Sequence, residues 1–323
     1  MKYFFVLNPG SAGGKSRRHF RSVLEAARQR RARFDFEICR NLDHACDLSR
    51  KANLSGYDVV VAVGGDGTIN RVLNGFYDEK GKRISDALLG VLHAGTSPDF
   101  CRSYAIPCRF ESALELLFEG SVKQIIVGRI TLANQFDPAC DGKPISDNVL
   151  FHTRYFACCA NIGLGASIAR YANNGIRKWL GDSPGTFIAI ARSLARFEQS
   201  PFSIISDGKA QTIHRLVNMA IGRTFHVASG IKVRSELREY DRSFYRLAIH
   251  DLRLIDVMPC LVSLYSGKAL QDGRYAQLGY CSSIQVLGNN LHPEVECDGD
   301  PLGFLPCSIE TAADQLGVIG GPS

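Results

Sequence analysis

The chain has 323 residues, of which 45% are hydrophobic and 22% charged, and its formal net charge is +6 at pH 7. This length exceeds the usual size of one hydrophobic core, so we expect two soluble domains. The eleven cysteines are odd in number and contain no Cys-x-x-Cys pair, which argues against a disulfide scaffold and favours reduced thiols in the cytoplasm. The apolar start is too short for a signal peptide and no segment reaches membrane-spanning length, so we expect any membrane contact to be peripheral.

Strand-like and helix-like segments alternate along the first third of the chain. We predict strands at 2–8, 34–39, 57–63 and 87–92, and helices at 16–31, 43–53, 68–76 and 110–118. This alternation is typical of a doubly wound α/β domain. Ligands bind such sheets outside the carboxyl ends of the strands, where glycine-bearing loops follow Leu7, Val63 and Leu92. We therefore expect one crevice to collect all three loops.

The central loop reads Gly-Gly-Asp-Gly-Thr and follows a Val-rich run without polar alternation. Gly64, Gly65 and Gly67 lack Cβ atoms, so main-chain N–H groups can come close to a phosphate. We expect Thr68 to be the N-cap of the following helix. The carboxylate of Asp66 would repel a bare phosphate, which indicates a bridging Mg²⁺, an ordered network or a proton-accepting role. A glycine turn used only for packing is the weaker interpretation.

The first loop, residues 8–16, comes close to a Walker A motif. Pro9 stands where that motif needs glycine, which disfavours a P-loop NTPase. Asn8 and Lys15 can reach a nucleotide from this loop, although Lys15 and Ser16 could equally well only open an exposed helix. Basic residues are concentrated between 15 and 33, which suits nucleotide phosphates, an anionic membrane surface or nucleic acid, and equally a solvated helix face.

The third loop repeats the pattern of an apolar strand, a glycine, hydroxyl residues, an acid and then a helix. Thr96 can donate to a phosphate or a sugar, whereas Asp99 suits a favourable charge at the start of a helix. Near the C-terminus, Asp298 and Asp300 flank a glycine. Taken alone, this last pattern predicts an ordinary hairpin turn.

After about residue 122 the chain becomes β-rich, which predicts a largely antiparallel second domain. We place the domains at 1–122 and 123–323, and leave open whether the last residues return to the first domain. Helical patterns at 186–197 and 256–266 and a polar loop at 137–148 interrupt the strands. The strand-like segments are 123–132, 150–160, 201–206, 215–221, 245–250 and 277–286.

In this order, an NPxxG-type loop, GGDGT, a GTxxD loop and a DGE-like turn resemble the diacylglycerol kinase catalytic family. That family includes bacterial diacylglycerol kinases, YegS-like kinases and sphingosine kinases, and the resemblance spans essentially the whole chain. It implies a nucleotide-binding α/β domain with a β-rich lipid-substrate domain. It also implies transfer of the γ-phosphate of ATP, with Mg²⁺, to a hydroxyl of a lipid such as diacylglycerol or a sphingoid base.

The resemblance assigns roles residue by residue. Asp298 and Asp300 match the acidic pair near the transferred phosphate, one of them being the general base, and Asp66 is the third catalytic candidate. Asp241 is the candidate ligand of a structural Mg²⁺. We expect a lipid partner and peripheral membrane contact but no nucleic acid, and a homodimer stays open. The residues matched to ATP binding are Asn8, Gly10, Gly64, Gly65, Asp66, Gly67, Thr68, Asn70, Gly95 and Thr96.

Three departures from the family pattern bear on activity. Pro98 stands where the family has an amide side chain, Asp300 shortens the usual glutamate by a methylene, and Arg242 follows Asp241 in place of glycine. They keep open a catalytically reduced relative that binds lipid or nucleotide. An NAD kinase, which shares the GGDGT loop, fits the other loops less well. A hydrolase based on the GxSxG match at Ser183 is disfavoured, because no buried strand precedes it and Ser-Pro is typical of a helix start.

Overall fold

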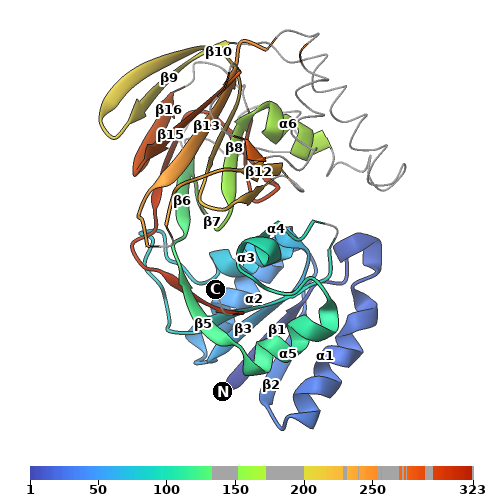
Figure 1. Ribbon diagram of the computed structural model, residues 1–323. Helices are drawn as coiled ribbons and strands as arrows, with labels where there is room; N and C mark the ends of the chain where they lie inside the picture. The colour runs from blue at the N-terminus through green and yellow to red at the C-terminus, as the bar shows by residue number, and fades with distance from the viewer. Residues whose placement is uncertain are drawn as a thin grey trace. The chain divides into compact units, whose positions relative to one another are not determined.

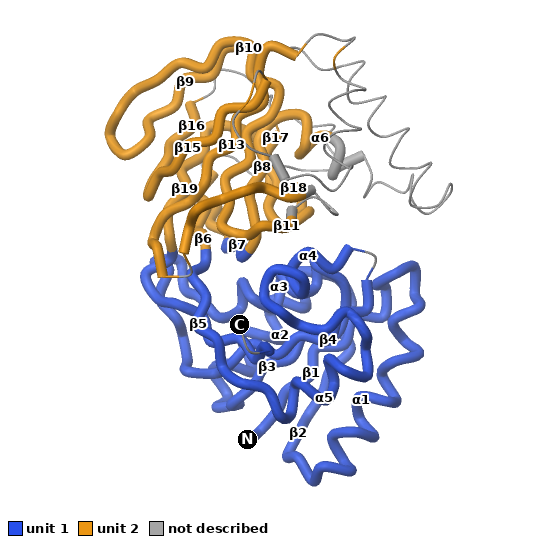
Figure 2. The backbone as a smooth tube through the Cα atoms, in the orientation of Figure 1, with its two compact units in different colours: residues 1–127, 155–157, 312–323 blue, residues 128–154, 158–311 orange. Residues whose placement is uncertain are grey.

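The computed structural model describes residues 1–95, 97–132, 152–171, 200–227, 231–238, 240–252, 256, 269–270, 273, 275–287 and 294–321. The chain divides into two compact units, which Figure 2 colours separately. Unit 1 comprises residues 1–127, 155–157 and 312–323, and unit 2 comprises residues 128–154 and 158–311. The predicted α/β domain followed by a β-rich antiparallel domain is confirmed.

Unit 1 is built on a six-stranded sheet with the order β2-β1-β3-β4-β20-β5. All neighbouring pairs are parallel except β20 and β5, which run antiparallel. Every residue of β3 is buried, as expected for a Val-rich strand covered on both faces. The strands are β1 (Lys2–Leu7), β2 (Arg33–Ile38), β3 (Val59–Gly64), β4 (Leu88–His93), β5 (Ser121–Ile125) and β20 (Leu316–Gly320).

Helices connect the parallel strands of unit 1 (Figure 1). Helix α2 begins at a conventional cap, since the Asn41 side chain accepts the His44 N–H at 2.8 Å. Helix α3 begins earlier than its sequence predicts: Gly65 is its N-cap, so the expected N-cap role of Thr68 is wrong. The helical segments are η1 (Ser11–Gly14), α1 (Arg17–Gln29), α2 (Leu42–Leu54), α3 (Asp66–Asn74), α4 (Asp99–Ser103) and α5 (Phe110–Glu119).

Unit 2 is dominated by a large, mostly antiparallel sheet whose main path is β18-β17-β8-β10-β9-β16-β19-β6-β7. Strand β13 branches from β10 and pairs with β15. The strands are β6 (Gly128–Leu132), β7 (His152–Phe156), β8 (Cys159–Gly163), β9 (Ser200–Ser206), β10 (Lys209–Gly222), β13 (Phe244–His250), β15 (Ala276–Cys281), β16 (Ser283–Leu287), β17 (Glu294–Cys297), β18 (Asp300–Phe304) and β19 (Cys307–Thr311). A small sheet of β11 (His226–Val227), β12 (Ile231–Val233) and β14 (Ala269–Leu270), and helix α6 (Leu164–Tyr171), complete its described elements.

Three segments expected as single strands each form two strands. Segment 123–132 divides between β5 of the first sheet and β6 of the second, and segment 150–160 divides between β7 and β8. Segment 277–286 breaks at Ser282, whose N–H and that of Ser283 both donate to the Asp207 carboxylate. The expected helices at 186–197 and 256–266 and the loop at 137–148 lie outside the described residues, apart from the single residue 256.

Within the described part of the chain, no helix combines the length and apolar character needed to cross a membrane. The cysteines described there are all free thiols.

Candidate functional site

The loop after β1 is tied to the loop after β3. The Asn8 side chain donates to Thr68 Oγ1 at 2.7 Å, and its own Oδ1 accepts the Gly10 N–H at 2.9 Å. Ser11 Oγ accepts the Gly65 N–H at 3.1 Å and lies 3.3 Å from Thr68 Oγ1. Thr68 therefore helps to join two of the three predicted loops instead of capping α3.

The loops after β3 and β4 approach each other through glycines. The Ala94 N–H donates to the Gly64 carbonyl at 2.7 Å. A Cβ added to Gly95 would lie 2.5 Å from Cα of Gly65, and one added to Gly64 would lie 2.4 Å from Thr68 Oγ1. Such distances leave room only for hydrogen, so the glycines are required for this packing. The three predicted loops therefore meet at one edge of the unit 1 sheet.

Asp66 lies in the first turn of α3 and points toward the β4 loop. Its Oδ2 accepts the Asp99 N–H at 3.2 Å, and its Oδ1 lies 3.7 Å from His93 Nε2. Burial lowers the pKa of His93, so the imidazole is neutral near pH 7 and this contact is not an ion pair. His93 Nε2 is also 3.1 Å from the Ser97 carbonyl. Asp66 thus stands in an ordered network, one of the roles expected for it.

A cavity of about 470 Å³ opens beside these loops. Lys15 lines it from the residues just before α1, Arg18 from the first turn of α1, and Ala94 and Gly95 from the β4 loop. His19 also lines it and stacks on Phe110, with ring centroids 4.0 Å apart. Two cationic side chains beside a glycine-rich loop are suited to hold an anion such as phosphate.

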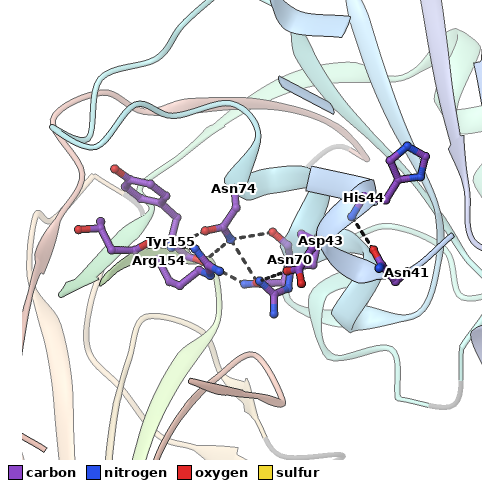
Figure 3. Close-up of polar contacts among 9 residues, drawn as sticks. Asn41, Asp43, His44, Asn70, Asn74, Arg154 and Tyr155 are labelled. Carbon is purple, nitrogen blue, oxygen red and sulfur yellow. Dashed lines mark hydrogen bonds and ion pairs between the residues drawn. The ribbon is translucent and has the colours of Figure 1, made fainter. Parts of the chain in front are cut away.

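Asn70 is buried, and its side chain points toward Asn74 and Tyr155 (Figure 3). Its Nδ2 donates to the Tyr155 carbonyl at 2.9 Å, as does Nδ2 of Asn74. The Asn74 Oδ1 accepts the Tyr155 N–H at 2.9 Å. The two amides therefore hold the short stretch 155–157 within unit 1, which gives Asn70 a structural task besides the nucleotide contact predicted for it.

Asp298 and Asp300 lie at the hairpin that joins β17 and β18. Both strands belong to unit 2 (Figure 2). The two-residue turn is Asp298-Gly299, with φ of 48° and 84°, as in a type I′ turn. Asp298 Oδ1 accepts the N–H groups of Cys158 and Cys159, each at 3.0 Å. The segment therefore forms the hairpin turn that its sequence predicts, and two main-chain N–H groups fix the carboxylate of Asp298.

Asp241 lies in a turn, where its Oδ2 accepts the Arg238 N–H at 2.8 Å. Its flanking side chains include Arg238 and Arg242, which do not favour a cation. Among the described residues no group of three or more His, Cys, Asp or Glu side chains is arranged to hold a metal. Glu239 lies outside the described residues, and a magnesium site at Asp241 stays a prediction.

Some contributors to this site carry no sequence signal of their own. Ser11 and His93 are ordinary residues in the sequence, and only the folded chain brings them to Gly65 and Asp66. Ser16 belongs to the same group, since its Oγ donates to the Asn8 carbonyl at 2.7 Å. Of the predicted residues, Thr96 and Ser183 lie outside the described part.

Comparison with known proteins confirms the resemblance. Residues 2–130 match the diacylglycerol kinase catalytic domain. A stretch of 74 residues is 40% identical to a diacylglycerol kinase of Staphylococcus saprophyticus, and a stretch of 82 residues is 35% identical to one of Staphylococcus aureus. These matches span 23% and 25% of the length of both this chain and each relative.

The whole fold is shared with a solved structure. A diacylglycerol kinase from Bacillus anthracis str. Sterne superposes over 99% of this chain and 97% of its own, with a TM-score of 0.67 and 17% sequence identity. At this level of identity the likeness establishes the fold and leaves the chemistry to the residues.

Proposed function

We propose that this chain, whose residues 2–130 match the diacylglycerol kinase catalytic domain, is an ATP-dependent lipid kinase. It transfers the γ-phosphate of ATP to a hydroxyl of a lipid such as diacylglycerol or a sphingoid base. The observation that carries the proposal is the packing of the Gly-Gly-Asp-Gly-Thr loop against the β4 loop through Gly65 and Gly95. The named relatives, which are diacylglycerol kinases, support the choice of a lipid acceptor.

The donor side of the reaction is assigned to unit 1. Backbone N–H groups at the start of α3 and the partial positive charge of that helix end favour phosphate oxygens. Lys15 and Arg18 add positive charge from the neighbouring cavity wall. Phosphoryl transfer needs mainly in-line positioning and neutralisation of charge, and these groups supply both.

Asp66 is a hard oxygen donor beside this loop, which fits a magnesium ion bound with the nucleotide. When bound, Mg²⁺ neutralises charge on the phosphates. The chain itself orients the carboxylate, since the Asp99 N–H holds Asp66 Oδ2 at 3.2 Å.

The acceptor side is assigned to Asp298 and Asp300. One of these carboxylates accepts the proton of the lipid hydroxyl as that oxygen attacks phosphorus. Asp298 is fixed by two N–H groups on its Oδ1. Asp300 opens β18, where its Cα pairs with Cys297. The acceptor lipid is expected at a membrane surface, with the protein bound peripherally.

A catalytically reduced relative that binds lipid or nucleotide is the second candidate. The observation that favours it is the β4 loop, where Pro98 has no N–H to offer and the N–H of Asp99 is already donated to Asp66. Fewer main-chain donors are then left for a nucleotide in this loop.

The test is transfer of radiolabelled γ-phosphate from ATP, with Mg²⁺, to a panel of detergent-dispersed lipids. We expect the wild-type protein to label at least one lipid and Asp66→Ala to reduce its turnover about 100-fold or more. Asp43→Ala is the matched control, because Asp43 occupies the first turn of α2 and is exposed. This control is expected to retain turnover.

Two outcomes would reject the proposal. Tight ATP binding without any labelled lipid would favour the binding relative. Labelling of NAD, offered as the acceptor in a parallel assay without lipid, would favour an NAD kinase. Equal loss in the Asp66 and Asp43 variants would show a general effect of charge at a helix start.

A further inference from the structure

Glu296 is a buried carboxyl group that the mechanism above does not use. It lies in β17, two residues before Asp298, and the residue is only 4% exposed. Its Oε2 accepts the N–H of Gly299 at 2.6 Å. Its Oε1 accepts the amide of Asn161, which lies in the neighbouring strand β8.

The contacts of Glu296 continue into a chain of hydrogen bonds through unit 2. Asn161 Oδ1 accepts Nδ2 of Asn218 in β10 at 3.4 Å, and Asn218 Oδ1 accepts the Gly165 N–H at the start of α6 at 2.8 Å. A Cβ added to Gly165 would lie 2.8 Å from that same Oδ1. These hydrogen bonds therefore link three strands and one helix, and they end at the Gly299 N–H.

The turn held by this network has a conformation suited to its residues. Asp298 adopts φ of 48°, a left-handed conformation that Asp reaches more readily than most residues with a Cβ. The Asp298 carboxylate is held on one side by Cys158 and Cys159, and the backbone of the next residue is held on the other side by Glu296. The turn is therefore restrained at two successive residues, by the Asp298 side chain and by the Gly299 N–H.

Packing alone would not require a carboxyl group here. Replacing a buried polar network with well-packed apolar side chains is often neutral or stabilising, so an apolar residue at 296 would serve a purely structural purpose. Burial, with the charges of Asp298 and Asp300, also raises the pKa of Glu296 to about 8. The group is then mostly neutral near pH 7 and adds little further repulsion beside the two aspartates.

We propose that Glu296 is a positioning residue, which holds the Gly299 N–H and thereby aims the carboxylates of Asp298 and Asp300 at the acceptor hydroxyl. The assignment of Asp298 and Asp300 rests on the proposed lipid kinase function. The hydrogen bond from the Gly299 N–H to Glu296 does not depend on that function, so the restraint of the turn and the kinase activity can be tested separately.

The experiment compares Glu296→Gln and Glu296→Met with the wild-type protein. The first readout is the hydrogen-exchange rate of the Gly299 amide by NMR, and the second is kcat and the KM for ATP in lipid phosphorylation. Glu296→Met removes the acceptor at similar volume, and we expect exchange about tenfold faster or more. We also expect kcat about tenfold lower or more with the KM for ATP within about twofold. Glu296→Gln keeps one acceptor oxygen, which can still receive the Gly299 N–H, but loses the one that faces the Asn161 amide, so we expect it to restore both at least part of the way to the wild-type values.

Glu294→Gln and Glu294→Met are the matched controls. Glu294 lies in the same strand and is 5% exposed, so its loss reports the general effect of removing a buried carboxyl. We expect neither Glu294 variant to change Gly299 exchange or kcat by more than about twofold. Should Glu296→Met fail to fold, Asn161→Ala removes the partner of Glu296 and is expected to accelerate Gly299 exchange in the same direction.

Unchanged Gly299 exchange in folded Glu296→Met would overturn the proposal, as would a loss of kcat that Glu296→Gln does not restore. If the wild-type protein phosphorylates no lipid, the proposed function fails. The exchange rates would still decide whether Glu296 holds the turn.

Discussion

At the scale of single residues, we expect Gly95→Ala and Gly67→Ala to have opposite effects on stability. A Cβ at Gly95 would lie 2.5 Å from Cα of Gly65, so Gly95→Ala must separate the two loops. We expect it to lower the free energy of unfolding by about 1–3 kcal/mol and to weaken ATP binding about tenfold or more.

A Cβ at Gly67 would meet only Leu42 Cδ1 at 3.8 Å. Inside α3, Gly67→Ala should therefore keep or raise stability by up to about 1 kcal/mol.

Urea unfolding and ATP titration calorimetry of the two variants decide this point. Equal stability of Gly95→Ala and the wild-type protein would contradict the close packing of the loops. A folded Gly67→Ala that binds ATP poorly would show that the nucleotide itself approaches this position, since the chain alone leaves room for the methyl group.

The residue scale also shows how much of the site the sequence predicts. The glycines are predictable because a close backbone approach excludes every other residue type. Thr68 is not, because the same hydroxyl can cap a helix or accept a hydrogen bond from a distant loop. Its partners Asn8 and Ser11 are 60 and 57 residues away in the sequence, and no local sequence pattern predicts a contact between residues so far apart.

At the scale of elements, β17 contains a carboxyl group whose titration should change stability. Burial, reinforced by Asp298 and Asp300 and opposed by hydrogen bonds from Asn161 and Gly299, raises the pKa of Glu296 from 4.5 to about 8. Between these values the folded chain holds a proton that the unfolded chain has released, so the free energy of unfolding falls as pH rises. The loss is at most about 1.4 kcal/mol for each pH unit in this window.

Urea unfolding at several pH values, with Glu296→Gln as the reference that cannot titrate, measures this loss. The difference in unfolding free energy, wild type minus variant, should decrease from pH 5 to pH 8. A difference that stays constant would mean that Glu296 keeps an ordinary pKa in the folded chain.

Strand boundaries illustrate what periodicity can and cannot predict. Strands β1, β3 and β4 of the first sheet follow from apolar runs that end at glycine or polar residues. Segment 123–132 misleads because Ile126 and Val127 are also buried, so its apolar run continues through the place where the chain leaves one sheet for another. The break at Ser282 depends on Asp207, which is distant in sequence, and the residues near 282 do not predict it.

At the scale of the whole molecule, the chain returns to its first sheet to complete it. Strand β20 lies between β4 and β5, parallel to β4 and antiparallel to β5. Leu316, Val318 and Ile319 are at most 5% exposed, and each such side chain contributes about 1.5–3 kcal/mol when buried. Their sum is comparable to the whole stability of a typical domain, so unit 1 should not fold without the last residues.

The prediction is tested by ending the chain after Thr311 and following hydrogen exchange by mass spectrometry. Peptides covering β3 and β4 should exchange about 100-fold faster or more than in the full chain, whereas peptides from β10 and β13 should keep their protection if unit 2 folds by itself. Val318→Asp in the full chain should act in the same direction, because it buries an unpaired charge at the centre of β20.

Unchanged protection of β3 and β4 would show that the other strands suffice to fold unit 1. Loss of protection in both units would show that they fold as one cooperative body, and that β20 stabilises the whole chain.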